Sequence, residues 1–492
     1  MMANYQWTGN SGTGVFAVAA NWNLGNTVAS VPPGPNDFAT IASAAEVITG
    51  GGTVETLFFQ GTDRVAGQLT ATYGSPVNGE MTLLPGAVLT APMLHIGVQL
   101  PQGAQAPFVG TLTVGKDSRV VIAGTHSIDN YGILLAAVAP TGNAPGSNAT
   151  LVVDGENAVV DGGNLPMSVG QVDKGQLIVQ NSGTVSVGSG DPLIYPWPLV
   201  IGNHPGANGK VQVSTNGLLQ ARGQVIVGRE ANGTLEVSEG GTVVARDLAI
   251  GWAPATGTQP AGVGTVTVTG GNARLVVENQ LEVQHMGTGS LMVENNGFVS
   301  AGISILVNGT LTLSGGQIET NALAVNPPAT LSGSGTVTAA AGFYIAGTVT
   351  ATNALNLIGD IDNASTITVA ENGHLRCLGT IVDTGKIALQ LNGIASVEAV
   401  PSSQTIEFLG KGARLVLLNP GAFLGKISGF AASHKIELDT VAKKLVYTAP
   451  PLLTVEDALG NVVAQLTFDT TYPGGFKFDA GAPPGRSIIE LK

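Results

Sequence analysis

Between Gly209 and Val325 the chain repeats one pattern of apolar and polar positions five times. Each copy has three short runs in which aliphatic residues alternate with polar ones, and turns rich in Gly, Asn and Ser separate the runs. Alternation with a period of two places every second side chain on one face of a strand. A unit of roughly 20 residues cannot bury its apolar face alone, whereas stacked units form a continuous aliphatic column. The pattern predicts an all-β protein, a parallel β-helix (β-solenoid) that is right-handed and has three strands per coil.

The first strand of each copy is expected to present one face to the core and the other to solvent. The inward pairs are aliphatic in every copy. The residues between them are mostly polar: Gln212, Glu236, Thr267, Met292 and Thr312. Glu236 is the one carboxylate among these five.

The spacing of the copies favours coils with loops at one corner. Gly209 and Gly233 are 24 residues apart, close to the size of one coil, whereas 31 residues separate Gly233 from Gly264. The excess lies in residues 252–263, directly after Ile250-Gly251. Further insertions follow the Ile-Gly pairs that end at residues 97 and 202. Loops that emerge from one corner of a stacked array line one side of it, which is the usual place for a binding surface.

Residues 1–50 differ from the array and are predicted to cap its first end. They hold Trp7, Phe16 and Trp22 in a chain that is only 5% aromatic. An open solenoid end exposes strand edges and core side chains, so a cap of large apolar residues is expected there. The alternative is that Trp7 and Trp22 form a platform on which a sugar stacks.

The repeat array is expected to span residues 51–400, and a C-terminal β domain to span residues 401–492. In the latter segment the strands are longer, and Phe and Lys recur. Residues 458–461 are predicted to form a hairpin turn between two strands. This domain would close the array, or serve assembly or export.

Composition excludes several classes of protein. The net charge is −13 and the sequence lacks a basic stripe, which argues against a nucleic-acid partner and suits solubility outside cells. A single cysteine, Cys377, allows neither a disulfide framework nor a cysteine metal site, and we interpret it as a small buried apolar residue. The sequence has no apolar stretch long enough to insert in a membrane and no visible cleaved Sec signal.

The sequence resembles bacterial surface proteins with autotransporter-type β-strand repeats. The resemblance rests on the opening segments Tyr5-Gln6-Trp7 and 35–41, on the repeat G-[TS]-L-x-V-x-x-G-G-x-V, and on Ile406-Glu407-Phe408-Leu409-Gly410 with residues 427–430. It implies an exported surface or matrix protein with a parallel β-helical passenger. The chain departs from that family in having no Sec signal and no room for an outer-membrane barrel after residue 400. A type I-like export route fits both departures, although the glycine-rich calcium-binding nonapeptide of such substrates is missing.

Candidates for catalysis are few. A carbohydrate-active enzyme needs two or three carboxylates that converge on one face. Asp360 and Asp362 form the closest pair in the sequence, but they adjoin turn residues. Asp154, Asp161 and Asp173 form a second group, which could meet across neighbouring coils, although the sequence does not fix how those coils align. The six histidines lack the spacing of metal ligands. These histidines are His95, His126, His204, His285, His374 and His434. We predict no catalytic residue, metal or cofactor.

Interaction residues are instead expected at two places. Tyr195, Trp197 and Trp252 lie in or beside the corner loops and would present contacts, for example to a surface glycan. Four lysines near the C-terminus would attract the acidic body of another copy and favour head-to-tail self-association. They are Lys426, Lys435, Lys443 and Lys444.

These features together favour a non-enzymatic structural protein of a bacterial surface or matrix, either an adhesin or a self-assembling filament or sheet subunit. The alternatives are a carbohydrate-active β-helix, such as a polysaccharide lyase or a tailspike-like glycosidase, and a plain glycan-binding module that uses Trp197 and Trp252.

Overall fold

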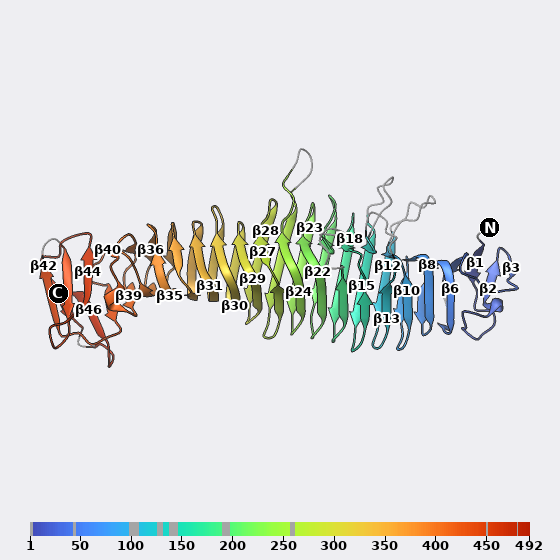
Figure 1. The fold of residues 1–492 in the computed structure, drawn as a ribbon, viewed down its shortest axis with the longest axis horizontal. Coiled ribbons are helices and arrows are strands. Elements are labelled where there is room, and N and C mark those ends of the chain that lie inside the picture. The colour runs from blue at the N-terminus through green and yellow to red at the C-terminus, as the bar shows by residue number, and fades with distance from the viewer. Residues whose placement is uncertain are drawn as a thin grey trace. The chain divides into compact units, whose positions relative to one another are not determined.

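The protein was analysed as a computed structural model. It describes residues 3–42, 46–97, 108–124, 131–136, 146–188, 197–255, 261–448, 451–479 and 481–492. These residues form 46 strands and two short 3-10 helices, so the predicted all-β class is confirmed (Figure 1). The chain divides into two compact units. Unit 1 comprises Met1–Glu278 and Gln284–Ser290, and unit 2 comprises Asn279–Val283 and Leu291–Lys492.

Within unit 1, parallel strands pair from coil to coil in three ladders, as a β-solenoid requires. The first ladder comprises β5 (Val47–Ile48), β7 (Thr62–Val65), β9 (Glu80–Leu83), β12 (Val109–Val114), β15 (Asn148–Asp154), β18 (Lys174–Gln180), β21 (Asn208–Val213), β23 (Asn232–Ser238) and β25 (Val263–Thr269). The second comprises the first parts of β6 (Gly51–Phe59) and β8 (Gln68–Val77), then β10 (Val88–Ala91), β13 (Arg119–Ile122), β16 (Val159–Asp161), β19 (Thr184–Val187), β22 (Leu218–Val227), β24 (Thr242–Ile250) and β26 (Arg274–Val277). The third comprises β4 (Phe38–Ile41), the second parts of β6 and β8, β11 (Leu94–Ile96), β14 (Ile133–Leu135), β17 (Met167–Val169), β20 (Leu199–Ile201) and the second parts of β22 and β24.

Unit 2 has the same three-ladder arrangement. The first ladder runs through β30 (Thr310–Val325), β31 (Thr330–Ile345), β32 (Thr348–Ile358), β34 (Thr366–Val369), β36 (Lys386–Leu389), β38 (Thr405–Phe408) and β40 (Lys426–Ser428). The second runs from β29 (Phe298–Val307) through β30, β31 and β32 to β35 (His374–Val382), β37 (Ile394–Ala399), β39 (Arg414–Leu417) and β41 (Lys435–Leu438). The third includes β27 (Gln280–Val283), later parts of β29, β30 and β31, β33 (Ile361–Asn363) and the end of β35. β28 (Thr288–Glu294) begins in unit 1 and ends in unit 2.

The register follows the repeated glycine that opens each copy. Gly175, Gly209, Gly233 and Gly264 face one another in successive coils of the first ladder. This register places Val211 opposite Leu235, and both side chains are fully buried. The aliphatic column predicted from the alternation is therefore the core of unit 1.

A close approach of the backbone explains why glycine recurs at this position. A Cβ added to Gly233 would lie 2.2 Å from the backbone nitrogen of Gly228 and 2.3 Å from the carbonyl oxygen of Ile201. Gly228 itself forms the corner after the third strand of the coil, with φ at +73°. Glycine is the residue best suited to that left-handed conformation.

From the end of β8 to the end of β24, the third ladder of unit 1 is buried on both faces. The outward residues Leu134, Val200 and Ile226 are at most 1% exposed, like the inward residues beside them. Strands that are buried on both faces have continuous apolar sequences instead of alternating ones. The runs Leu199–Ile201 and Val225–Val227 follow this rule.

The N-terminal segment covers the first edge of each ladder in unit 1. β1 (Asn4–Trp7) pairs parallel with β4 and antiparallel with β2 (Trp22–Leu24), which pairs in turn with β3 (Thr27–Val28), and η1 (Ala19–Asn21) precedes β2. Val15 forms a parallel bridge with Thr49 beside β5, and the ring of Phe16 lies against Gly52 of β6.

The aromatic residues of this segment form a buried cluster. Trp22 is fully buried and packs edge-on against Trp7 and Phe16, with ring centroids 5.0 and 4.9 Å away. Its indole nitrogen donates a hydrogen bond to the carbonyl oxygen of Phe16 at 2.7 Å. The rings therefore offer no open face for a sugar and serve the packing of this end.

The C-terminal segment pairs with the last strands of the first two ladders in unit 2. β44 (Val462–Phe468) extends the first ladder beside β40, and β46 (Ser487–Leu491) pairs antiparallel with β41. β42 (Lys444–Thr448), β43 (Leu452–Glu456) and β44 form an antiparallel meander, which confirms the hairpin predicted around residues 458–461. β45 (Phe476–Phe478) pairs with β46, and η2 (Pro420–Ala422) lies between β39 and β40.

Parallel pairing extends beyond residues 51–400 in both directions. It begins at β1 and β4 and continues to β41 in the second ladder and to β44 in the first. The change in composition near residue 401 corresponds instead to a core that becomes aromatic. Its rings belong to Phe408, Phe430, Phe468, Tyr472 and Phe476.

Candidate functional site

Five residues form a column at the corner that follows the third strand in unit 1. We call Gln171, Asn203, Arg229, Trp252 and His285 the corner column. Each comes directly after a residue with positive φ that turns the chain. These turn residues are Gly170, Gly202, Gly228, Gly251 and Gln284, so all but the last are glycines. Backbone hydrogen bonds link neighbouring coils here, for example from the Arg229 nitrogen to the Gly202 oxygen and from the Trp252 nitrogen to the Gly228 oxygen, both at 2.9 Å. The corner thus fixes where each of these side chains starts.

The inner part of the corner column is a chain of hydrogen bonds. The amide nitrogen of Asn203 donates to Gln171 Oε1 at 2.7 Å and to the hydroxyl oxygen of Tyr131 at 3.1 Å. Arg229 donates from Nη1 to Asn203 Oδ1 at 2.8 Å. Asn203 is fully buried and uses both ends of its amide, so it holds the guanidinium group of Arg229 in one position.

The outer part of the corner column is aromatic. The rings of Trp252 and His285 stack with a centroid distance of 4.2 Å and an interplanar angle of 13°. Trp197 lies edge-on to Trp252 at 5.7 Å, and the guanidinium carbon of Arg229 lies 5.1 Å from the centroid of the Trp197 ring. Both tryptophans pack against an apolar floor on the outer face of the third ladder, formed by Tyr131, Leu134, Val200 and Ile226.

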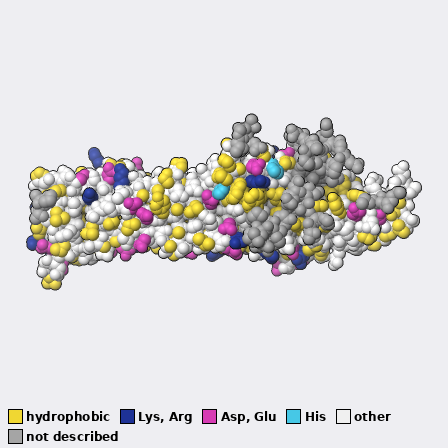
Figure 2. Space-filling model, turned by 45° about the horizontal axis from the view of Figure 1, so that its top comes forward, with side chains coloured by type: hydrophobic (Ala, Val, Ile, Leu, Met, Phe, Trp, Pro, Cys, Tyr) yellow, Lys and Arg dark blue, Asp and Glu magenta, His cyan; other side chains and the backbone are white. Residues whose placement is uncertain are grey.

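Charges of both signs border the aromatic rings. Arg229 Nη2 lies 3.3 Å from Glu230 Oε1, and Glu230 Oε2 lies 3.9 Å from His204 Nδ1. The side chains of Arg229, Glu230 and His204 are 23%, 26% and 42% exposed, so all three reach solvent. Figure 2 shows histidine, basic and acidic side chains close together beside hydrophobic ones on this face of unit 1. The cluster offers hydrogen-bond donors and acceptors around two indole rings.

A buried histidine lies on the same outer face. His95 of β11 pairs in register with Leu134 of β14 and is 7% exposed. Its Nε2 has no hydrogen-bond partner among the described residues, and burial lowers the pKa of this imidazole to about 4. His95 is therefore neutral at pH 7 and belongs to the packing of this face.

The structure brings together two of the aromatic residues singled out in the sequence. Trp197 and Trp252 are 55 positions apart in the chain but adjacent in space. The third, Tyr195, lies outside the described residues. Whether these rings bind a partner stays a prediction.

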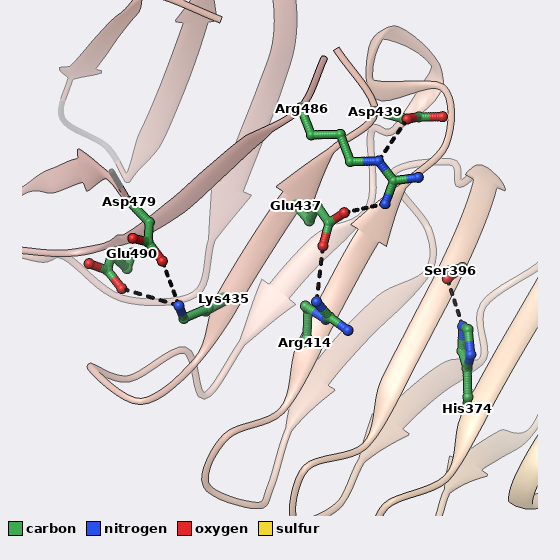
Figure 3. A network of polar contacts seen from close by, with 9 residues as sticks. All are labelled: His374, Ser396, Arg414, Lys435, Glu437, Asp439, Asp479, Arg486 and Glu490. Carbon is green, nitrogen blue, oxygen red and sulfur yellow. Dashed lines mark hydrogen bonds and ion pairs between the residues drawn. The ribbon is translucent and has the colours of Figure 1, made fainter. Parts of the chain in front are cut away.

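The four lysines of the C-terminal segment do not form one patch of unmatched charge. Lys435 lies 2.6 Å from Asp479, and Lys444 lies 2.8 Å from Glu456. Lys426 and Lys443 are exposed and form no ion pair with any described residue. Residues 401–492 hold nine Lys or Arg and eight Asp or Glu, so the segment is nearly neutral. Figure 3 shows the network of ion pairs around Lys435 and Glu437.

Glu437 is the centre of that network. Its side chain is 3% exposed and accepts hydrogen bonds from Arg414 at 3.2 Å and from Arg486. Arg486 also lies 3.2 Å from Asp439, and the Glu437 carboxylate raises the pKa of Arg486. Arg414 belongs to β39 and Arg486 precedes β46, so this carboxylate ties the C-terminal strand to the solenoid of unit 2.

Four of the five carboxylates weighed for catalysis have separate local partners, and the fifth, Asp362 of β33, pairs in register with Tyr344 of β31. Asp360 accepts from the Thr380 nitrogen at 2.8 Å, Asp154 from Asn181 at 2.6 Å, and Asp161 from Arg119 at 2.8 Å. Asp173 accepts from the nitrogens of Gly146 and Ser147, both at 2.7 Å. Within the described ranges no three His, Cys, Asp or Glu side chains gather as a metal site would require.

The histidines have individual surroundings. His374 forms a 2.9 Å hydrogen bond with Ser396, and burial together with Arg414 and Arg376 lowers the pKa of its imidazole. His434 packs on Phe408, and burial lowers its pKa too. His126 lies outside the described residues. Cys377 is fully buried, and burial raises the pKa of its thiol to about 12.

Sequence reasoning did not identify Gln171, Asn203, Arg229, His285 or Tyr131 as site residues. The first three share a signal, because each follows the Val-Gly or Ile-Gly pair that ends a third strand. Alignment of the copies on that pair would have placed them in one column with Trp252. His285 follows Val283-Gln284, where the glycine is replaced, and Tyr131 has no sequence signal of this kind.

No helix among the described residues is long and apolar enough to cross a membrane. The chain matches no known protein family, and no curated protein matches it.

Proposed function

We propose that this chain is a non-enzymatic structural protein of a bacterial surface or matrix, exported from the cell. It acts as an adhesin through the corner column of unit 1 and the residues that border it. The scaffold would supply stiffness, because its interior consists of stacked aliphatic side chains and its strands are hydrogen-bonded from coil to coil. The corner would supply contact with a partner.

The covered ladder edges carry this proposal. Exposed strand edges are templates for pairing with other chains. In unit 1 the edge strand β4 is paired by β1, and Val15 forms a bridge with Thr49, directly after β5. In unit 2 β40 and β41 are paired by β44 and β46. Covered edges favour a separate molecule that displays a surface over a subunit that propagates through its strand edges.

A carbohydrate-active enzyme is the alternative from another class. It would need two carboxylates converging near a sugar, and four of the five candidates, Asp360 of the closest pair among them, are engaged in separate hydrogen bonds. The adhesin proposal is therefore preferred over a lyase or a glycosidase.

Electron microscopy and light scattering of the purified chain at rising concentration test the proposal. We expect discrete particles of constant size, and labelling of intact bacteria by an antibody against the chain. Ordered fibres or sheets would place the function in self-assembly instead. Label found only after cell lysis would overturn the surface location.

A further inference from the structure

We infer that the corner column, together with Trp197, Glu230 and His204, is a binding site for a neutral glycan. The inference rests on the proposed function in that it names the ligand class for the same corner. The ligand is a polymer or oligomer of uncharged sugars, whose ring faces are apolar and whose edges carry hydroxyl groups.

The two tryptophans supply the apolar part of such a site. The chain has only four tryptophans, and two of them are buried in the N-terminal cluster. The other two, Trp197 and Trp252, lie together on the outside of the third ladder and are partly exposed. Partly exposed tryptophans in an aromatic-poor protein are poorly explained by core packing alone, whereas indole rings are well suited to cover the apolar face of a ligand.

The indole nitrogens strengthen this assignment. A buried tryptophan usually finds a hydrogen-bond acceptor for its N–H group. The buried Trp22 does so within the N-terminal cluster. Neither Trp197 nor Trp252 donates such a bond to any residue in the described part of the chain. Within the described ranges, both indole N–H groups thus remain open to ligand hydroxyl groups beside the stacking surface.

The charged residues supply both kinds of hydrogen-bonding group. Arg229 donates and Glu230 accepts, and His204 lies beside Glu230, with its Nδ1 3.9 Å from Glu230 Oε2. A sugar hydroxyl both donates and accepts, so a mixed border suits it better than a border of one sign. A buried amide holds Arg229 in place, so the site is ordered before a ligand arrives.

Charge balance favours a neutral sugar over an acidic one. Arg229 is already paired with Glu230 at 3.3 Å and bonded to Asn203. A uronate or sulfate group would have to compete with Glu230 for this cation and approach a chain with a net charge of −13. An uncharged glycan meets neither obstacle.

Tryptophan fluorescence gives a direct test, because half of the tryptophans lie at the site. The full chain is titrated with cellohexaose, maltohexaose, xylohexaose and mannohexaose as neutral probes, and with hexagalacturonate as the acidic probe. We expect at least one neutral probe to change the fluorescence with a saturable curve, and the acidic probe to bind at least tenfold more weakly. Absence of binding by all neutral probes, or preference for the acidic probe, would overturn the inference.

Variants locate the binding. We expect Trp252→Ala to raise the Kd at least tenfold and Arg229→Met to raise it several-fold, whereas Trp252→Phe retains part of the affinity, as measured by calorimetry. Tyr344→Ala is the matched control, because Tyr344 is an aromatic residue that is 45% exposed in unit 2. Unchanged affinity in Trp252→Ala, with a native circular-dichroism melt, would contradict the assignment.

The two proposals can fail separately. If no glycan probe binds but the protein forms discrete particles and lies on the cell surface, the adhesin proposal stands with another ligand. Glycan binding by a protein that forms sheets, or that stays inside the cell, would overturn the adhesin proposal and keep the site.

Discussion

A methyl group on the α-carbon of Gly233 would lie 2.2 Å from the backbone nitrogen of Gly228, far inside van der Waals contact. We therefore expect Gly233→Ala to destabilise unit 1 by about 3 kcal/mol, at the upper end of the usual cost of overpacking, because only backbone could move to make room. Urea unfolding followed by tryptophan fluorescence measures this, since all four tryptophans belong to unit 1.

Gly271 provides the control for that substitution. A Cβ added there would meet no atom within 4 Å, and the residue does not have a left-handed φ. We expect Gly271→Ala to leave unit 1 unchanged or to stabilise it by less than about 1 kcal/mol. Equal losses of stability in the two variants would show that the coil spacing is not set by the close approach at Gly233.

Glu437 is expected to be a major determinant of stability in unit 2. Its nearly buried carboxylate accepts from Arg414 and Arg486, and Glu437→Gln would leave two arginines facing a neutral group. The carboxylate is buried but the two arginine side chains are 39% and 41% exposed, so we expect a loss of about 2 kcal/mol, between that of an exposed pair and that of a fully buried one. Chemical unfolding followed by far-ultraviolet circular dichroism measures it.

Glu456→Gln is the matched comparison within the same unit. Glu456 pairs with Lys444, whose side chain is 64% exposed. An exposed pair contributes less than about 1 kcal/mol. If Glu437→Gln costs no more than Glu456→Gln, the Arg414–Glu437–Arg486 contacts do not hold the C-terminal strand.

Unit 1 is expected to lose stability as the pH falls from 6.5 towards 4. Burial lowers the pKa of His95 from its ordinary value of 6.5 to about 4. In that pH window the unfolded chain binds a proton that the folded chain does not, so the free energy of unfolding decreases as the pH falls. The full effect of this one group is about 3 kcal/mol. Urea midpoints at pH 7 and pH 4.5 measure it.

His95→Leu tests the origin of this pH dependence. The variant keeps an apolar side chain beside Leu134 and removes the titrating group. We expect it to match the original chain or exceed it in stability at pH 7, and to lose less stability on acidification. The same loss in both proteins would assign the pH dependence to other groups.

Charge reversal at the C-terminal lysines is expected not to alter the size of the particles. Lys435 and Lys444 already pair with Asp479 and Glu456, and only Lys426 and Lys443 lack an ion pair within the described residues. Light scattering of Lys426→Glu/Lys443→Glu at low and high salt should therefore match that of the unaltered chain. Concentration-dependent growth that disappears in this variant would instead establish head-to-tail attraction.

The alternation of aliphatic and polar residues was sufficient to predict the fold class and the register in the repeat array. Gly209 and Gly233 could be aligned from their flanking residues, because each coil repeats the same constraint on the backbone. The hairpin after Glu456 was equally visible, since its turn signal is local. Features that depend on short-range geometry can therefore be predicted from neighbouring residues.

The candidate site was predicted only in part, because its contacts join residues from different coils. Trp197 and Trp252 stood out by composition, but their adjacency depends on the lengths of the segments between them. Sequence reasoning did not single out Arg229, which the corner places over Trp197. The apolar floor was hidden as well, since a run such as Leu199–Ile201 looks like any core strand. Its burial on the outer face requires the rings that cover it.

The corner after the third strand also has a consequence for how this chain can change through evolution. The segments that join the third strand to the next first strand differ in length, with six residues from Gly202 to Ala207 in one coil and twelve from Gly251 to Gly262 in another, yet β21, β23 and β25 keep an unbroken register. A mutation that inserts or deletes residues at this corner therefore leaves the inherited core intact. Recognition at the corner can diversify in related lineages while selection on the scaffold preserves the coil.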